Sequence, residues 1–126
     1  MTYILDFSPP ARGIEGTFNT VRLGGAWAKR LVPGDRVLLV ERPKSILIGV
    51  ATIEKIEVGT MRAIATEHAH RNHNQIVEDD PTGAPDRLVT AMIKRYGPHK
   101  CNENSRVTMI LMRREAPQCL TPFLSP

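Results

Sequence analysis

The sequence predicts an α+β fold that is mainly β, a small barrel of five to six strands with two to three flanking helices. Three observations predict it. Short β-branched runs bounded by Pro and Gly recur along the chain, helical periodicity is confined to a few segments, and strands and helices do not alternate as a doubly wound sheet requires. With 126 residues the chain can bury one core, so we expect residues 1–126 to form a single domain.

Five segments have the β-branched composition and the length of strands. In chain order they are residues 2–8, 17–23, 32–41, 45–58 and 106–114. Pro9-Pro10 ends the first strand, and Pro33-Gly34 forms the turn that leads into the third. Segment 45–58 is the strongest strand signal, and Gly49 within it predicts a bend or bulge at a corner of the barrel.

Three segments have the apolar spacing of helices. They are residues 25–32, 60–74 and 85–98. One face of the first helix is expected to carry Trp27, Leu31 and Val32. Thr60 is a suitable N-cap for the second helix, while Pro85 suits the first turn of the third and Gly97-Pro98 ends it. Residues 116–126 contain three prolines and predict an irregular tail.

The composition, 41% hydrophobic and 24% charged, is typical of a soluble globular protein. No apolar run approaches the roughly 20 residues of a membrane span, and the N-terminus lacks a signal-peptide pattern. We therefore expect a cytoplasmic protein with no membrane partner. Cys101 and Cys119 have no CxxC spacing and are expected to be free thiols.

The net charge of +4 is distributed unevenly along the chain. Residues 1–53 carry seven basic and four acidic side chains, residues 54–86 carry three and seven, and residues 87–126 carry seven and two. If the two basic ends come together in space, they form a positively charged face. Such a face favours nucleic acid or another phosphate-bearing ligand as a partner.

The second predicted strand, in the stretch EGTFNTVRLGG, carries polar side chains. In an extended chain one side presents Phe18, Thr20 and Arg22, and the other presents Thr17, Asn19 and Val21. The side with Arg22 lies either against water or in a pocket. Arg22 can bind a ligand there, or it can pair with an acidic neighbour such as Asp35 or Glu41.

Three segments together match a known family pattern. They are Thr20 with Arg22, the turn Gly34-Asp35, and the run IGVATIEKI at residues 48–56. They resemble the ASCH domain, a branch of the PUA-like superfamily of small RNA-associated β-barrels, whose hallmark is Gly-x-Lys-x-x-Thr-x-Arg followed by a Gly-Asp turn and a Gly-x-Ala-x-Ile type run. The segments ATEHA and IKRYGP also lie where a short bacterial ASCH group has comparable segments. The resemblance spans most of the chain and implies a PUA-like barrel.

Two positions depart from the motif of that family. Counting back from Thr20, the lysine of the motif falls on Thr17 and its glycine on Glu15. Some small ASCH proteins are amidohydrolases that remove the acetyl group of N4-acetylcytidine with a lysine–threonine–glutamate arrangement, in which threonine is the nucleophile. Here Thr20 remains, the lysine does not, and the glutamate would fall near His70 to His73. Either of these histidines is a candidate base that could replace the missing partners.

Further residues are candidates for ligand contacts. The expected ligand-binding set is Thr17, Asn19, Thr20, Arg22 and Trp27, and the expected contacts to a nucleic-acid backbone are Lys29, Arg30, Arg42 and Lys44. Core packing is the alternative role of Trp27, and a solvated surface is that of the basic residues. The histidine group of residues 68–73 has no HExxH and no paired cysteines beside it, so we expect no metal and no cofactor.

Two hypotheses of function follow, from different classes. The first is a binding module, in which the cleft beside residues 17–23 takes RNA, another single-stranded nucleic acid or a nucleotide, and Arg22 anchors a phosphate or carbonyl. The second is an amidohydrolase acting on a modified nucleoside such as N4-acetylcytidine, with Thr20 as nucleophile. The second weakens if Thr17 points into the cleft and no other cation lies near Thr20. A protein-interaction domain with a vestigial cleft is a third alternative.

Overall fold

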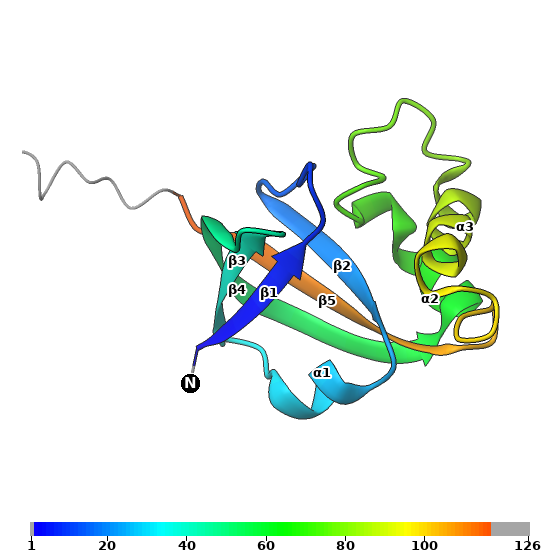
Figure 1. Ribbon diagram of the computed structural model, residues 1–126, viewed down its shortest axis with the longest axis horizontal. Helices are drawn as coiled ribbons and strands as arrows, with labels where there is room; N and C mark the ends of the chain where they lie inside the picture. Colours follow the sequence, from blue (N-terminus) through cyan, green and yellow to red (C-terminus); the bar gives the residue numbers. More distant parts are fainter. Residues whose placement is uncertain (1, 117–126) are drawn as a thin grey trace, which may run out of the picture.

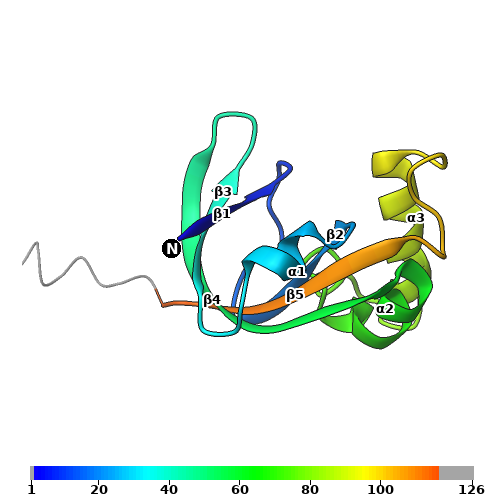
Figure 2. The same cartoon turned by 90° about the horizontal axis from the view of Figure 1, so that it is seen from below.

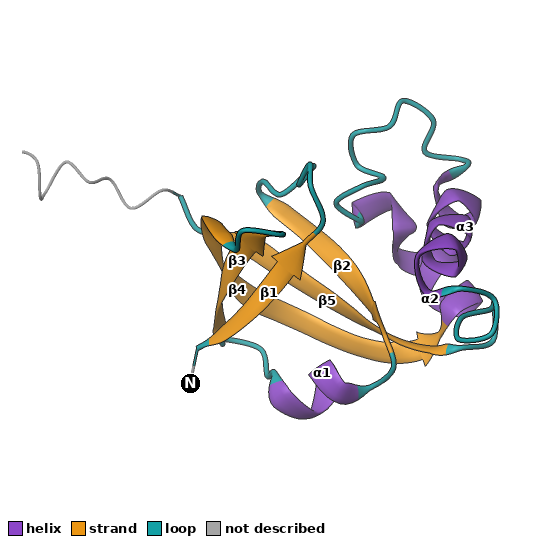
Figure 3. Cartoon of the chain, viewed as in Figure 1, coloured by secondary structure: helices purple, strands orange, loops and turns teal. Residues whose placement is uncertain are grey.

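Five strands form one sheet, and the helices pack along it (Figure 1 and Figure 3). The computed structural model describes residues 2–116. Its strands are β1 (Tyr3–Phe7), β2 (Thr17–Leu23), β3 (Arg36–Glu41), β4 (Ile46–Thr60) and β5 (Arg106–Arg114). Its helices are α1 (Ala26–Arg30), α2 (Met61–His68), the 3-10 helix η1 (Ala69–Arg71) and α3 (Ala84–Tyr96). The predicted tail 116–126, beyond its first residue, and Cys119 lie outside the described residues.

The sheet is mixed and curls into a half-barrel (Figure 2). Its strand order is β1-β3-β4-β5-β2. β1 pairs with β3 in parallel, and the other three pairings are antiparallel. The predicted fold class, a mainly β α+β fold of five strands with flanking helices, is therefore confirmed. Because the sheet curls, its two edge strands, β1 and β2, approach each other although they lie at opposite ends of the strand order.

Strand β5 lies inside the sheet, between β4 and β2, and is buried on both faces. Val107 and Met109 belong to the core under α2 and α3, whereas Ile110 and Met112 belong to the core inside the half-barrel. Successive side chains of a strand point to opposite faces, so β5 supplies both cores. This explains why its sequence, apart from the buried Thr108, is an apolar run and does not alternate.

Two bulges bend β4 around the barrel. The register shifts between Leu39↔Gly49 and Val40↔Leu47, which leaves Ile48 as the extra residue. A second shift lies between Ile53 and Lys55, opposite β5. A bulge increases the local twist and bends its strand, which is how one long strand can serve two parts of a curled sheet. The bend predicted at Gly49 is confirmed.

The helix ends follow the predicted capping residues. The hydroxyl of Thr60 accepts a hydrogen bond from the Ala63 amide at 3.2 Å, as expected of an N-cap. Pro85 lies in the first turn of α3, and Gly97, with a φ of +86°, ends that helix. None of the described helices is long and apolar enough to cross a membrane.

The first helix is shorter than predicted. The chain leaves α1 at Leu31, whose backbone is extended, so Val32 is 58% exposed and does not share the buried face of Leu31. Residues 32–35 then form a turn in which the Asp35 carboxylate accepts a hydrogen bond from the Val32 amide at 2.9 Å. The third strand consequently begins at Arg36 and not at residue 32.

Candidate functional site

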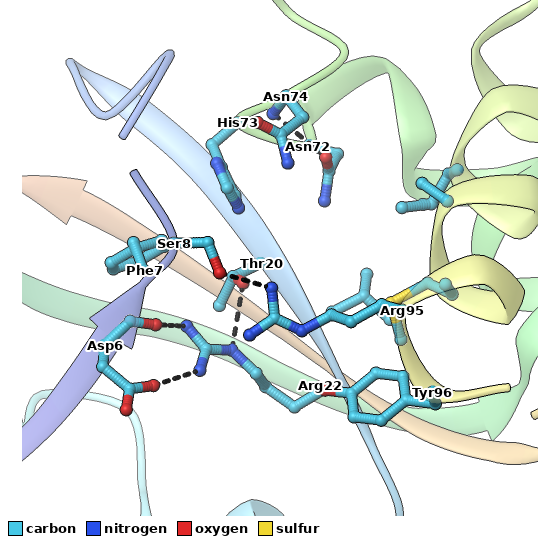
Figure 4. A pocket seen from close by; sticks show the side chains of 14 residues that line it. Asp6, Phe7, Ser8, Thr20, Arg22, Asn72, His73, Asn74, Arg95 and Tyr96 are labelled. Carbon is cyan, nitrogen blue, oxygen red and sulfur yellow. Dashed lines mark hydrogen bonds and ion pairs between the residues drawn. The ribbon is translucent and has the colours of Figure 1, made fainter. Parts of the chain in front are cut away.

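A cavity of ≈ 200 Å³ lies between the open side of the half-barrel and α3 (Figure 4). Its walls come from four places in the chain: the end of β1, the second half of β2, the loop after η1, and α3. Both polar and apolar side chains line it. No single local segment of the sequence therefore encodes the cavity.

The inner face of β2 supplies one wall. Phe18 fills the core inside the half-barrel, and Thr20 and Arg22, on the same face, follow it into the cavity. Asn19 points to the other face, where its Nδ2 donates to the carbonyl of His68 at 2.9 Å. The polar side of β2 thus faces the cavity, while Asn19 is fully buried and holds the sheet to the end of α2.

Arg22 joins the two edge strands of the sheet. Its Nη1 donates to Asp6 Oδ1 at 3.2 Å, its Nη2 donates to the Asp6 carbonyl at 2.7 Å, and its Nε donates to Thr20 Oγ1 at 3.2 Å. The guanidinium also lies over the ring of Phe7, 5.1 Å from the ring centroid. The acidic partner is therefore Asp6, and the predicted partners Asp35 and Glu41 were wrong, because the curl of the sheet brings β1 beside β2.

Arg22 and Asp6 each stabilise the charged form of the other. Burial lowers the pKa of Arg22, whose side chain is only 15% exposed, and the Asp6 carboxylate opposes that effect. Burial raises the pKa of Asp6, but hydrogen bonds and charge from Arg42 and Arg22 outweigh it and leave this pKa below its ordinary value. Both groups are therefore ionised at neutral pH, and Arg22 acts as a structural cation as well as a wall of the cavity.

Arg95 is a second cation in the cavity, and the sequence analysis missed it. It projects from α3, and its Nη1 donates to the hydroxyl of Ser8 at 2.7 Å, across the cavity from its own helix (Figure 4). One signal could have found it. Arg95 follows Leu88 and Met92 at helical spacing, so it is a charged residue on the apolar stripe of α3.

The ring of His73 forms the wall opposite Arg22. It packs edge-on against Phe7 and Phe18, with ring centroids 5.0 and 6.5 Å away. Its Nδ1 lies 3.1 Å from the carbonyl oxygen of Arg12, and because a carbonyl can only accept, Nδ1 carries the proton of the neutral ring. The Nε2 lone pair is then free; among the described residues no hydrogen bond involves it, and the ring points into the cavity (Figure 4).

The surroundings of His73 keep its ring neutral. Burial, followed by the positive charges of Arg22 and Arg95, lowers its pKa to about 4. The backbone of Gly13, at a φ of +64°, lies so close that a Cβ there would be 1.9 Å from the His73 carbonyl oxygen. Only glycine fits at that position, so the loop of residues 11–14 fixes where His73 stands. His70, the other candidate base, is exposed and does not line the cavity.

The structure separates the remaining predicted contacts from the cavity. Thr17, at the start of β2, does not line it, and neither does Trp27, which packs edge-on against Tyr3 at 6.2 Å. Arg30 stacks over the Trp27 ring, 5.5 Å from its centroid. Of the expected backbone contacts, Lys29 and Arg30 belong to α1, and Lys44 is exposed in the β3–β4 turn. Arg42 alone of this set approaches the cavity, because its Nε donates to Asp6 Oδ2 at 2.6 Å.

A second group of ligand-type side chains lies outside the cavity. Glu57, Glu67 and His68 have oxygen and nitrogen atoms within 4.8 Å of one another. Glu57 Oε2 is 2.8 Å from His68 Nε2, and the ammonium of Lys55 is 3.4 Å from its other oxygen. The lysine competes with any metal ion for this carboxylate. The contacts are those of a surface ion-pair network, and we assign no metal to it.

Comparisons with known proteins show the fold. No known family model matches the sequence, and no curated protein is significantly similar to it. The crystal structure of hypothetical protein PH0355 is similar with a TM-score of 0.61 and 12% identity, over 91% of this chain and 100% of that one. The crystal structure of protein EF3133 from Enterococcus faecalis V583, described by the family model DUF984, is similar with a TM-score of 0.55 and 8% identity, over 82% of this chain and 62% of that one.

Proposed function

We propose that the chain is an ASCH-like module that binds a nucleotide, or one nucleotide unit of RNA, in the cavity beside β2. The observation that supports this most is the lining, which combines the cations of Arg22 and Arg95 with hydroxyl, amide and aromatic groups. Cations recognise phosphates and base carbonyls, and aromatic rings recognise the faces of bases. A volume of ≈ 200 Å³ is below the roughly 300–1,000 Å³ of pockets that bury a drug-sized ligand, so the cavity takes one nucleotide at most and encloses only part of it.

The sequence resemblance supports the same proposal. Thr20 and Arg22, the two residues that match the ASCH motif, both lie in the cavity wall. Strand periodicity places Thr20 and Arg22 on one face of β2, but it does not say which face meets the cavity. One face of β2 packs against α2, and the other faces the inside of the half-barrel. The motif residues and the cavity therefore coincide.

Blocking the cavity tests this function. Ala91 lines the cavity from an exposed position of α3, so Ala91→Phe fills its mouth without disturbing a core. Thr90→Phe is the matched control, since Thr90 is the exposed neighbour on the same helix and does not line the cavity. We expect ribonucleotides or a short single-stranded RNA to bind the wild type and Thr90→Phe equally and Ala91→Phe at least about tenfold more weakly. Equal binding by all three proteins would place the ligand elsewhere.

An amidohydrolase is the second candidate, and two observations favour it. Thr17 does not line the cavity, yet a cation is near Thr20, because Arg22 Nε lies 3.2 Å from its hydroxyl oxygen. His73 is neutral with a free Nε2 that points into the same cavity. In this mechanism Nε2 takes the hydroxyl proton while Thr20 Oγ1 attacks the amide carbonyl. The proton then passes to the leaving amine, and water hydrolyses the acyl-threonine ester.

Product analysis separates the two candidates. The wild type, Thr20→Val and His73→Gln are incubated with N4-acetylcytidine, and cytidine and acetate are measured. Turnover that both substitutions abolish would establish the enzyme. Binding of nucleotides without any release of acetate would leave the binding module as the function.

A further inference from the structure

Two arginine side chains bind one carboxylate at the cavity, and a third arginine enters the cavity from α3. Asp6 accepts from Arg22 through Oδ1 and from Arg42 through Oδ2. Arg95 enters the same cavity from α3 and contacts a neutral partner, the Ser8 hydroxyl. The charged side chains of the lining are Arg22, Arg95 and Asp6, so two positive charges stand against one negative charge there, and that negative charge is also paired with Arg42. The cavity has an excess of positive charge.

The two arginines of the lining differ in the hydrogen-bond donors they leave free. Arg22 directs Nε, Nη1 and Nη2 at Thr20 and Asp6. Arg95 makes one described hydrogen bond, to Ser8, and its side chain belongs to an exposed residue. A guanidinium has five N–H donors in a planar fork, which matches the oxygens of a phosphate. Most of the fork of Arg95 is therefore available to a ligand, whereas that of Arg22 is largely used within the protein.

Like charges in the cavity also favour an anion. Burial lowers the pKa of Arg22, and the positive charge of Arg95 adds to that effect. An anionic ligand beside Arg95 and Ser8 would offset the repulsion between the guanidinium groups of Arg95 and Arg22. The aromatic rings of Phe7 and His73 line the cavity on the side away from α3, where they offer a surface to a base (Figure 4).

We infer that the cavity takes the phosphate-bearing form of its ligand, a nucleotide and not a nucleoside, and that Arg95 binds the phosphate. This rests on the proposed function as a nucleotide-binding module and adds to it a chemical class and a residue. It also reassigns the role expected of Arg22. Arg22 holds β1 to β2, and Arg95 together with the Ser8 hydroxyl supplies the donors that meet the phosphate.

Calorimetric titration with matched ligand pairs tests the inference. The ligands are the four ribonucleosides, their 5′- and 3′-monophosphates, and inorganic phosphate. For the preferred base we expect one monophosphate to bind about tenfold or more tightly than its nucleoside, since a charge-assisted hydrogen bond contributes that much, and this ratio should fall with added salt. Arg95→Gln should reduce the ratio to about twofold or less, and Arg95→Lys should restore part of it.

Lys94→Gln is the matched control, because Lys94 precedes Arg95 on α3, is exposed and does not line the cavity. It should leave the ratio at the wild-type value. Thermal unfolding of each variant verifies that it is folded. A monophosphate that binds no better than its nucleoside, or a ratio that survives Arg95→Gln, overturns the inference and leaves the proposed function standing. Inorganic phosphate binding as tightly as the nucleotide overturns it too, and binding of no ligand overturns both.

Discussion

At the scale of single residues, the imidazole of His73 shows how the cavity sets its own chemistry. Burial beside Phe7, together with the charges of Arg22 and Arg95, holds its pKa at about 4, below the 6.5 of an unperturbed histidine. The ring is therefore an acceptor at neutral pH. A neutral imidazole is suited to accept a hydrogen bond from a ligand N–H or O–H, or to take a proton from Thr20.

We predict that His73 makes the protein less stable in mildly acidic solution. The unfolded chain binds a proton on this histidine near pH 6.5 while the folded protein does not until about pH 4, so the free energy of unfolding falls as the pH decreases through that window. The loss attributable to His73 should approach about 3 kcal/mol as an upper value. Urea denaturation at several pH values measures this loss in the wild type and in His73→Gln. His70→Gln, at an exposed histidine, is the matched control.

The outcome is read from the difference between the two variants. In His73→Gln the free energy of unfolding should vary less with pH between about pH 4 and 6.5. In His70→Gln its variation with pH should be the same as in the wild type. A titration of His73 followed by NMR gives the same information directly. An NMR midpoint near 6.5 for His73 would contradict the prediction and would also remove the argument that the ring is a neutral acceptor.

The residues of the cavity differ in how far the sequence could reveal them. Alternation along one strand placed Thr20 and Arg22 on a common face, because strand periodicity is local information. Asp6 and Arg95 reach the cavity from β1 and α3, and nothing in the local pattern states that those elements meet β2. Tertiary curvature brings them together, so their roles become visible only in the folded chain.

At the scale of elements, one side chain supplies the hydrogen bonds across the open side of the half-barrel, where apolar side chains of β1 and β2 also pack together. β1 and β2 share no ladder hydrogen bonds, since they are the first and last strands of the sheet order. Arg22 bridges them through the carboxylate and the backbone carbonyl of Asp6. A guanidinium with several donors can satisfy a strand edge and a carboxylate together, which a lysine cannot do with the same geometry.

We predict that Arg22→Met lowers the free energy of unfolding by about 2 kcal/mol or more, because it leaves the Asp6 carboxylate and carbonyl without their buried partner. Arg42→Met is the control. It removes the other arginine bound to Asp6, but the Arg42 side chain is 61% exposed, so we expect less than about 1 kcal/mol. Urea denaturation at pH 7 measures both, and equal losses would contradict a bridging role specific to Arg22.

The ends of strands and helices could be predicted from the sequence better than the way these elements pack together. Residues 17–23 and 106–114 form strands with the predicted bounds, and Thr60 and Gly97 cap helices as their local chemistry indicates. The errors lie where a turn competes with a helix. Val32 fits the spacing of α1, but the Asp35 carboxylate binds its amide and draws it into a turn, which exposes its side chain.

At the scale of the whole molecule, β5 is the element that both cores share. It pairs with β4 on one side and with β2 on the other, and its two faces contribute to the two cores. β1, in contrast, pairs with β3 alone within the sheet, and among the described residues only Arg22 joins it to β2 by hydrogen bonds. The molecule should therefore open first at β1, on the side where the cavity lies.

We predict that the amides of Met109 and Ile110 exchange with solvent only through global unfolding, while the slowest amides of β1 exchange at least about tenfold faster through local opening. Native-state hydrogen exchange at low denaturant concentrations measures both. Arg22→Met should increase the difference in exchange rate between the β1 and β5 amides, because the hydrogen bonds from β1 to β2 are lost. A ligand bound in the cavity should decrease this difference in exchange rate, because β1 supplies part of the cavity wall and binding favours the closed state. Equal exchange in β1 and β5 would show that the half-barrel opens as one cooperative unit, so that Arg22 would have no separate role in closing it.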